Sequence, residues 1–176
     1  MRDKKIGCAY ALRDLGTQPI ALKPEGDEIP FGANFAIRMQ EQRQFSFDPR
    51  LGLCESDHIR GEETDVVRKI LRAGAGGRWV PNAQVQHVIP KQRQTEAYVR
   101  DYFVGQGRSG VRGAPLDSAP SFMGVPRWLW RAAITSQIRY AFARRFCSPG
   151  IWSRELREAS IYLGKYLERR DIRRVG

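Results

Sequence analysis

Three acidic residues, Glu62, Glu63 and Asp65, follow Gly61 at a position where the sequence predicts the start of a helix. A carboxylate can act as a general base when it lies beside a hydroxyl group and accepts its proton. The same three charges are also favoured at the positive end of the helix dipole, without any catalytic role. Their spacing alone therefore leaves both interpretations open.

His87 and Arg108 are candidates for binding ions. His87 lies between Val85 and Ile89 on one face of an expected strand, so a core histidine bonded to the backbone is an alternative to a metal ligand. A single histidine is also a poor metal site without carboxylate neighbours. The guanidinium group of Arg108 suits a phosphate, although a solvated arginine explains the sequence as well.

The run Gly105-x-Gly107-x-x-Gly110 matches the glycine pattern of dinucleotide-binding loops. Such a loop follows a strand, whereas this run follows an expected helix that begins after Thr95. No acidic residue is suitably placed downstream in a strand–helix–strand unit. We therefore interpret the run as a flexible helix end.

The elements expected to position these residues follow from the spacing of the apolar side chains. A helix is predicted from about Gly61, because apolar residues from Val66 to Leu71 recur at helical intervals, and Gly74 ends it. Residues 32–38 are predicted to form a short buried strand that leads to a brief helix, and residues 79–81 together with 83–89 are predicted to form one extended element. The other expected elements are a short strand at 6–12, a helix after Thr95, a helix that begins at Pro126 and is broken at Ser148-Pro149-Gly150, and a last helix at about 152–170.

The charge of the chain is strongly positive and unevenly distributed. The net charge is +11, and residues 117–176 contain 12 Lys and Arg against 5 Asp and Glu. This segment therefore suits an anionic partner such as lipid headgroups, nucleic acid or a polyanionic substrate. Within it, residues 126–146 combine tryptophan and phenylalanine with arginine, which is typical of a helix lying on an anionic membrane surface. Packing on the domain with solvated arginines is the alternative.

The three cysteines, Cys8, Cys54 and Cys147, are odd in number and widely spaced. A zinc ribbon or a disulfide framework is not expected from this pattern, and reduced cytosolic thiols are the simplest interpretation. The sequence has no apolar run of about 20 residues that would span a membrane. We expect a cytoplasmic protein, peripheral on the inner face of the plasma membrane if its basic helix binds lipid.

Six short segments of the chain resemble family 2 glycosyltransferases in their order and spacing, over about residues 28–112. They are Pro-Phe-Gly-Ala-Asn-Phe-Ala-Ile-Arg (30–38), Phe-Asp-Pro-Arg-Leu-Gly (47–52), Gly-Glu-Glu-Thr-Asp (61–65), Leu-Arg-Ala-Gly (71–74), Val-Pro-Asn-Ala-Gln-Val-Gln-His (80–87) and Gly-Gln-Gly-Arg-Ser (105–109). The resemblance implies an α/β fold. Residues 1–116 would be the C-terminal, acceptor-side half of a GT-A domain, and residues 117–176 a basic amphipathic helical tail.

The resemblance also implies an activity, namely transfer of a sugar from a nucleotide-sugar donor to a hydroxyl group of a glycan or lipid-linked acceptor, with inversion. The family's acidic pair, usually Glu-Asp, corresponds to Glu62 and Glu63, so Glu63 is the expected general base. Its extra methylene is a departure from the family, and small displacements of a catalytic group lower rates strongly. Asn34 and Gly32 would line the acceptor, although asparagine also tolerates unusual backbone angles, so a structural role for Asn34 is the alternative. His87 would lie near the donor diphosphate and a divalent metal ion, Mg or Mn.

The family holds its metal ion through an Asp-x-Asp motif, and this chain contains none. The donor-binding half that the family places before Gly32 is also missing, so we expect a fragment that is inactive alone. The alternative function is a non-enzymatic basic module that binds nucleic acid or an anionic membrane. Nucleic acid is disfavoured because no recognition motif is present. A degenerate transferase kept for protein interaction is a third possibility.

Overall fold

The computed structural model describes residues 4–49, 51, 61–112 and 119–175, which divide into two compact units. Among these residues, unit 1 comprises 4–9, 90–112 and 119–175, and unit 2 comprises 10–49, 51 and 61–89. The sequence had suggested a boundary between residues 116 and 117, and the two units are divided differently. Unit 2 is instead inserted between two stretches of unit 1.

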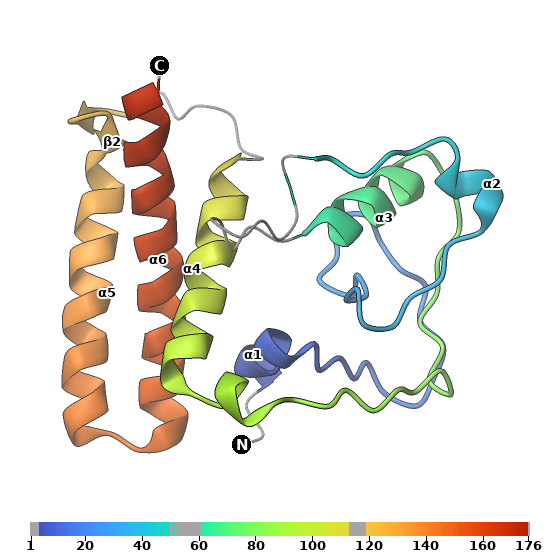
Figure 1. Ribbon diagram of the computed structural model, residues 1–176, viewed down its shortest axis with the longest axis horizontal. Coiled ribbons are helices and arrows are strands. Elements are labelled where there is room, and N and C mark those ends of the chain that lie inside the picture. Colours follow the sequence, from blue (N-terminus) through green and yellow to red (C-terminus); the bar gives the residue numbers. More distant parts are fainter. Residues whose placement is uncertain (1–3, 50, 52–60, 113–118, 176) are drawn as a thin grey trace. The chain divides into compact units, whose positions relative to one another are not determined.

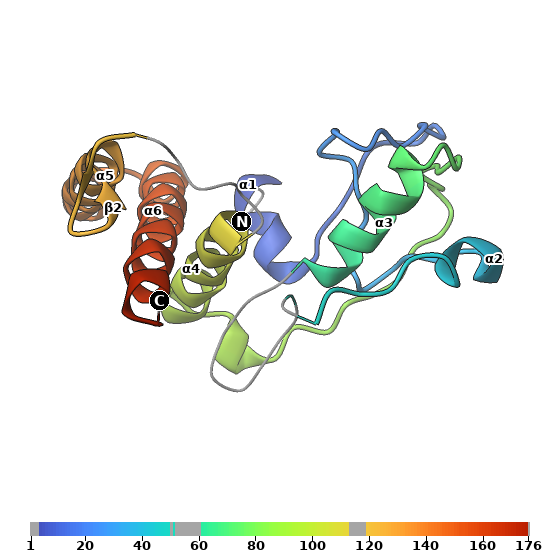
Figure 2. The ribbon, with the colours of Figure 1, turned by 90° about the horizontal axis from the view of Figure 1, so that it is seen from above.

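Unit 1 consists mainly of three long helices. These are α4 (Glu96–Arg112), α5 (Arg127–Phe146) and α6 (Pro149–Val175). Before α4 come α1 (Lys4–Gly7) and the 3-10 helices η1 (Cys8–Tyr10) and η2 (Lys91–Arg93), and between α4 and α5 come the short strands β1 (Ser121–Phe122) and β2 (Val125–Pro126). Figures 1 and 2 show α6 lying between α4 and α5. Phe103, Leu129 and Leu156 are the largest side chains from these three helices that are fully buried.

Two glycines allow α4 and α6 to approach closely. A Cβ atom built on Gly107 would lie 2.2 Å from the carbonyl oxygen of Ile161, and one built on Gly164 would lie 2.1 Å from that of Val104. Both distances are far below van der Waals contact, so no larger residue fits at either position without separating the helices. The prediction that the glycine run is a flexible helix end is therefore wrong, because Gly107 lies within α4 and packs against α6.

A buried carboxylate lies beside this contact. Glu168 of α6 is 3% exposed and forms ion pairs with Arg108 and Arg112 of α4, the first at 3.5 Å. A buried charge needs such partners, because desolvation of an unpaired carboxylate is costly. The network therefore fixes the register of α4 against α6.

A second polar cluster joins α5 to the start of α4. The hydroxyl group of Tyr140 donates a hydrogen bond to Glu96, and Arg144 donates another to the same carboxylate at 3.2 Å. Burial, together with the bond to Glu96, raises the pKa of Tyr140 above its ordinary value.

Unit 2 is built around the helix α3 (Glu62–Arg72), with a short helix α2 (Met39–Gln42) and irregular chain. The core contains the buried residues Ile29, Val67 and Leu71, against which Leu22 and other apolar side chains pack. One antiparallel bridge, Ala21 to Arg78, joins two passing segments. The end of α3 is as predicted, since Gly74 has a φ of 92°, a left-handed conformation that favours glycine.

The predicted α/β fold is wrong. The structure is mostly helical (56%), and its only described sheet is the two-stranded hairpin β1–β2. The strands expected at 32–38 and 83–89 are irregular, and Val85 is 58% exposed. Alternating apolar residues form a strand only beside a partner that satisfies the backbone, and no described ladder accompanies either segment.

The helical predictions agree better with the structure. Helices α3, α4, α5 and α6 all occur where periodicity placed them, and α6 begins at Pro149 and continues to Val175, beyond both expected ends. Thr95 caps α4 as expected, because its hydroxyl oxygen accepts a hydrogen bond from Tyr98 N at 3.2 Å. The strand expected at 6–12 is replaced by α1 and η1. None of the described helices is long and apolar enough to cross a membrane.

Candidate functional site

Three of the segments singled out in the sequence meet in unit 2. The backbone N–H of Gly32 donates a hydrogen bond to Glu63 Oε1 at 3.0 Å. Two residues later, Asn34 Nδ2 donates to the carbonyl oxygen of Ala83 at 2.6 Å. The turn at residues 32–34 is therefore tied to α3 on one side and to the segment 80–87 on the other.

The three acids at the start of α3 have different partners. Glu62 Oε2 accepts a hydrogen bond from Gly61 N at 3.0 Å, so it completes the beginning of its own helix. Asp65 forms an ion pair with Lys69 one turn later, at 2.6 Å. Glu63 alone of the three bonds outside its own helix, and none of the described residues bonds its Oε2 atom. Glu63 is thus the acid whose geometry leaves an oxygen for a ligand.

Gly32 is required for the contact with Glu63. A Cβ atom at this position would lie 2.9 Å from Glu63 Oε1 and 3.3 Å from its carboxyl carbon. Both distances are shorter than ordinary contacts, so any larger residue would push the carboxylate away. The absence of a side chain at residue 32 therefore sets the position of Glu63.

A pocket of about 510 Å³ in unit 2 brings Asn34 and His87 together. Aromatic rings line it as well, namely Phe31 and Trp79, and the guanidinium group of Arg13 lies 4.3 Å from the centre of the Phe31 ring. Flat apolar rings combined with a few polar groups suit a ligand with both hydroxyl groups and apolar ring faces, such as a sugar. The sequence did not predict the roles of Arg13, Phe31 or Trp79, although Phe31 directly precedes the Gly-Ala-Asn turn.

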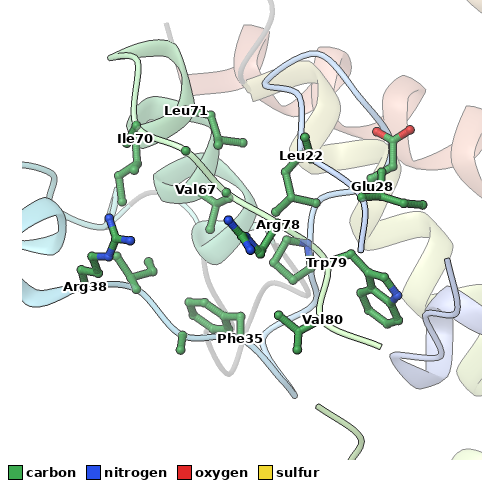
Figure 3. Close-up of a pocket in the computed structure, with 18 of the residues that line it drawn as sticks. Leu22, Glu28, Phe35, Arg38, Val67, Ile70, Leu71, Arg78, Trp79 and Val80 are labelled. Carbon is green, nitrogen blue, oxygen red and sulfur yellow. The ribbon is translucent and has the colours of Figure 1, made fainter. Parts of the chain in front are cut away.

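A larger pocket, of about 890 Å³, lies along α3 and is mainly apolar (Figure 3). Val67, Ile70 and Leu71 of α3 line one side of it, and Phe35 and Val80 lie across from them. The pocket continues the core of unit 2, and its lining includes neither Glu63 nor His87. It shares Pro30, Asn34, Trp79 and Ala83 with the smaller pocket, so the two spaces adjoin, whereas His87 lines only the smaller one and Glu63 lines neither.

His87 does not find the neighbours that a metal site needs. Its Nδ1 atom lies 3.0 Å from the carbonyl oxygen of Tyr10, and the side chain is exposed. The part of the chain that the structure describes contains no group of three or more His, Cys, Asp or Glu residues able to hold a metal ion. The described residues around His87 therefore do not by themselves form a site for the divalent ion that the resemblance implies, and no step is assigned to it.

Arg108 lies in unit 1, whereas Gly32, Asn34 and Glu63 lie in unit 2. Its guanidinium group pairs with Glu168 at 3.5 Å and with Asp171 at 3.2 Å. These carboxylates already compensate the charge that a phosphate would bind. The geometry favours a structural role for this arginine.

Comparisons of the chain with protein-family models, with curated proteins and with solved structures give no match. The site is therefore interpreted from its own geometry and from the resemblance of its segments.

Proposed function

We propose that unit 2 is the acceptor side of an inverting glycosyltransferase, which moves a sugar from a nucleotide-sugar donor to a hydroxyl group of a glycan or lipid-linked acceptor. The observation that carries the proposal is the hydrogen bond between Gly32 N and Glu63 Oε1, because it joins two segments that resemble the family. The bond from Asn34 to Ala83 adds a third segment. The support is this local arrangement and does not depend on a sheet.

In the proposed reaction Glu63 is the general base. Its Oε2 atom takes the proton of the acceptor hydroxyl while the hydroxyl oxygen attacks the anomeric carbon of the donor. The bond from that carbon to the diphosphate breaks, and its electron pair leaves with the nucleoside diphosphate. Attack opposite the leaving group inverts the configuration. The N–H of Gly32 holds Oε1, so that the base keeps its orientation.

The pocket lined by Asn34 and His87 is the proposed place for the acceptor sugar. Trp79 and Phe31 offer ring faces, and the side chains of Asn34 and His87 offer polar contacts. Asn34 has a further role, because its bond to Ala83 holds the turn that positions Gly32. A cytoplasmic site of action stays a prediction from the cysteine pattern.

The first experiment measures nucleoside diphosphate released from a panel of nucleotide sugars in the presence of glycan acceptors, with the chain fused to the donor-binding half of a family 2 glycosyltransferase, because the chain alone is expected to be inactive. Glu63→Gln keeps the size of the side chain and removes the base, so it is expected to lower the rate by at least about 100-fold. Glu62→Gln is the matched control, because this residue bonds only its own helix start, and it should retain most of the activity.

Saturation-transfer NMR with the same glycans measures acceptor binding separately from turnover. Binding should involve the pocket around Trp79 and should survive Glu63→Gln, because that substitution removes the base and leaves the pocket intact. A chain that neither releases diphosphate nor binds any glycan would contradict the proposal. Equal rates for the two glutamine variants would contradict the role of Glu63.

A further inference from the structure

The outer face of α5 exposes a line of large apolar side chains. Ile134, Ile138, Phe142 and Phe146 are each four residues apart and 54%, 63%, 62% and 68% exposed. Residues at this spacing share one side of a helix. Exposed apolar side chains that form a continuous patch mark an interaction surface more often than isolated ones do.

The opposite side of α5 is already used for packing within unit 1. Leu129, Ala133, Ser136, Tyr140 and Ala143 are buried there, where α5 contacts α6. The apolar line is therefore not part of the described core of unit 1. It remains uncovered when the three helices have packed.

Arginines stand at both ends of this apolar line. Arg127, Arg131, Ile134, Ile138, Phe142 and Arg145 follow one another at intervals of three or four residues, so they share one face. The whole of α5 contains five arginines and no aspartate or glutamate. Arg139 pairs with Glu155, and Arg144 pairs with Glu96. The other three arginines of α5, Arg127, Arg131 and Arg145, have no acidic partner among the described residues.

The hairpin before α5 adds exposed apolar side chains near the start of this helix. At its tip, Phe122 and Met123 are 60% and 63% exposed. The ring of Phe122 lies 6.1 Å from that of Trp130, whose indole N–H donates a hydrogen bond to the Phe122 carbonyl oxygen at 3.2 Å. Trp130 also packs against Tyr166 of α6, with ring centres 4.7 Å apart, and the hairpin lies at the N-terminal end of α5 (Figure 1).

We propose that this surface, the α5 outer face (Phe122, Met123, Arg127, Arg131, Ile134, Ile138, Phe142 and Arg145), lies on an anionic lipid bilayer. The helix would lie along the bilayer surface, with its apolar centre at the boundary of headgroups and acyl chains and its terminal arginines among the phosphates. From Arg127 to Arg145 the face is about 27 Å long, at 1.5 Å per residue. This inference is independent of the proposed sugar transfer.

The charges select this partner over a second copy of the chain. Two α5 outer faces placed together would bring six arginines into contact without any acidic residue between them. The apolar centre also distinguishes lipid from nucleic acid. A nucleic-acid site would need cations or stacking rings along its length, whereas the middle of this face holds the aliphatic side chains Ile134 and Ile138.

The test measures co-sedimentation of the full chain with vesicles of phosphatidylcholine, with and without phosphatidylglycerol. Binding is expected only to the anionic vesicles. The triple variant Ile134→Ser/Ile138→Ser/Phe142→Ser should lower the partition coefficient at least about 100-fold, because all three side chains enter the bilayer surface. These side chains are exposed, so the thermal unfolding of the variant should match that of the wild type.

The arginines are tested with Arg127→Gln/Arg131→Gln. Each should contribute roughly fivefold to partitioning on anionic vesicles, and the effect should weaken with added salt. Arg43→Gln/Arg154→Gln is the matched control, because it removes the same charge from exposed positions outside this face. The control should bind like the wild type.

Three results with vesicles would overturn the proposal. They are equal binding to neutral and anionic vesicles, wild-type binding by the triple serine variant, and an equal loss in the control arginine variant. Binding is also measured to a single-stranded oligonucleotide. If the chain binds the oligonucleotide but no vesicle, and the triple serine variant retains that binding, the partner is nucleic acid and the lipid proposal fails.

Discussion

The close contact of α4 and α6 predicts that two alanine substitutions in one helix have opposite effects. Gly107→Ala would place a Cβ atom 2.2 Å from the carbonyl oxygen of Ile161 and 3.0 Å from Lys165 N. These atoms belong to the backbone of α6 and cannot rotate away, so the helices must separate by about 1 Å, and overpacking of this kind costs about 3 kcal/mol. The higher helix propensity of alanine returns about 1 kcal/mol. The expected net loss is about 2 kcal/mol.

Gly110→Ala is the matched control, because nothing lies within 4 Å of a Cβ atom at that position. Only the propensity term applies there, near the end of α4, so this variant should be more stable by about 0.5 kcal/mol. Thermal unfolding followed by circular dichroism reports mainly the helices of unit 1. Gly107→Ala should lower the midpoint by about 8 °C or more, and Gly110→Ala should raise it by a few degrees, about 2 °C.

The two glycines of the contact should also be coupled. Gly164→Ala meets the carbonyl oxygen of Val104 at 2.1 Å, so one separation of the helices relieves both clashes. The double variant with Gly107→Ala should therefore lose less stability than the two single losses added together. A Gly107→Ala variant that is as stable as the wild type, or that shifts in the same direction as Gly110→Ala, would contradict the close approach of α4 and α6.

Three further predictions follow from other contacts. Gly32→Ala should displace the Glu63 carboxylate and lower the proposed transfer activity about tenfold or more, with an unchanged circular dichroism spectrum, since the displaced atom is at a side-chain end. The raised pKa of Tyr140 means that the folded state holds the phenol proton more tightly than the unfolded state does. The free energy of unfolding should therefore fall as pH rises above 10.0 toward the folded pKa. Tyr140→Phe should reduce this dependence on pH, as measured by urea titrations at alkaline pH. Glu168→Ala should lower the free energy of unfolding by about 3 kcal/mol, because it leaves Arg108 and Arg112 without their buried carboxylate. Glu158→Ala removes a more exposed ion pair, so in the same denaturant titration it should change the free energy of unfolding by less than about 0.5 kcal/mol.

The helices could be predicted because their signals are local. The start of α3 is marked by three acids, and its buried face by apolar residues within two turns. The expected strands have no such local signal. Alternation over residues 83–89 does not show which other segment would form backbone hydrogen bonds with them. The structure leaves Val85 and His87 exposed, and the α/β prediction failed at this step.

The candidate site was predictable in part. The sequence grouped Gly32, Asn34 and Glu63 by resemblance, and the structure brings Gly32 and Glu63 together across 31 residues. Spacing alone could not distinguish Glu63 from Glu62, because the distinction is which acid reaches outside the helix. The partners of Arg108 were equally inaccessible, since they lie about 60 residues further along, at Glu168 and Asp171.

The hydrogen bond between His87 and the carbonyl oxygen of Tyr10 brings the two ends of unit 2 together. Within unit 1, the hydrogen bond from Tyr98 to Ala9 closes a chain loop of 89 residues, and unit 2 lies within that loop. When unit 2 is folded, the path from Ala9 to Tyr98 runs through the bond between Tyr10 and His87 and is roughly ten residues long, about three halvings of the loop length. This shortening lowers the entropic cost of closing the loop by about 2 kcal/mol. Unfolding of unit 2 should therefore weaken unit 1 through chain entropy alone, so the stabilities of the two units are linked by connectivity even where no side chain joins them.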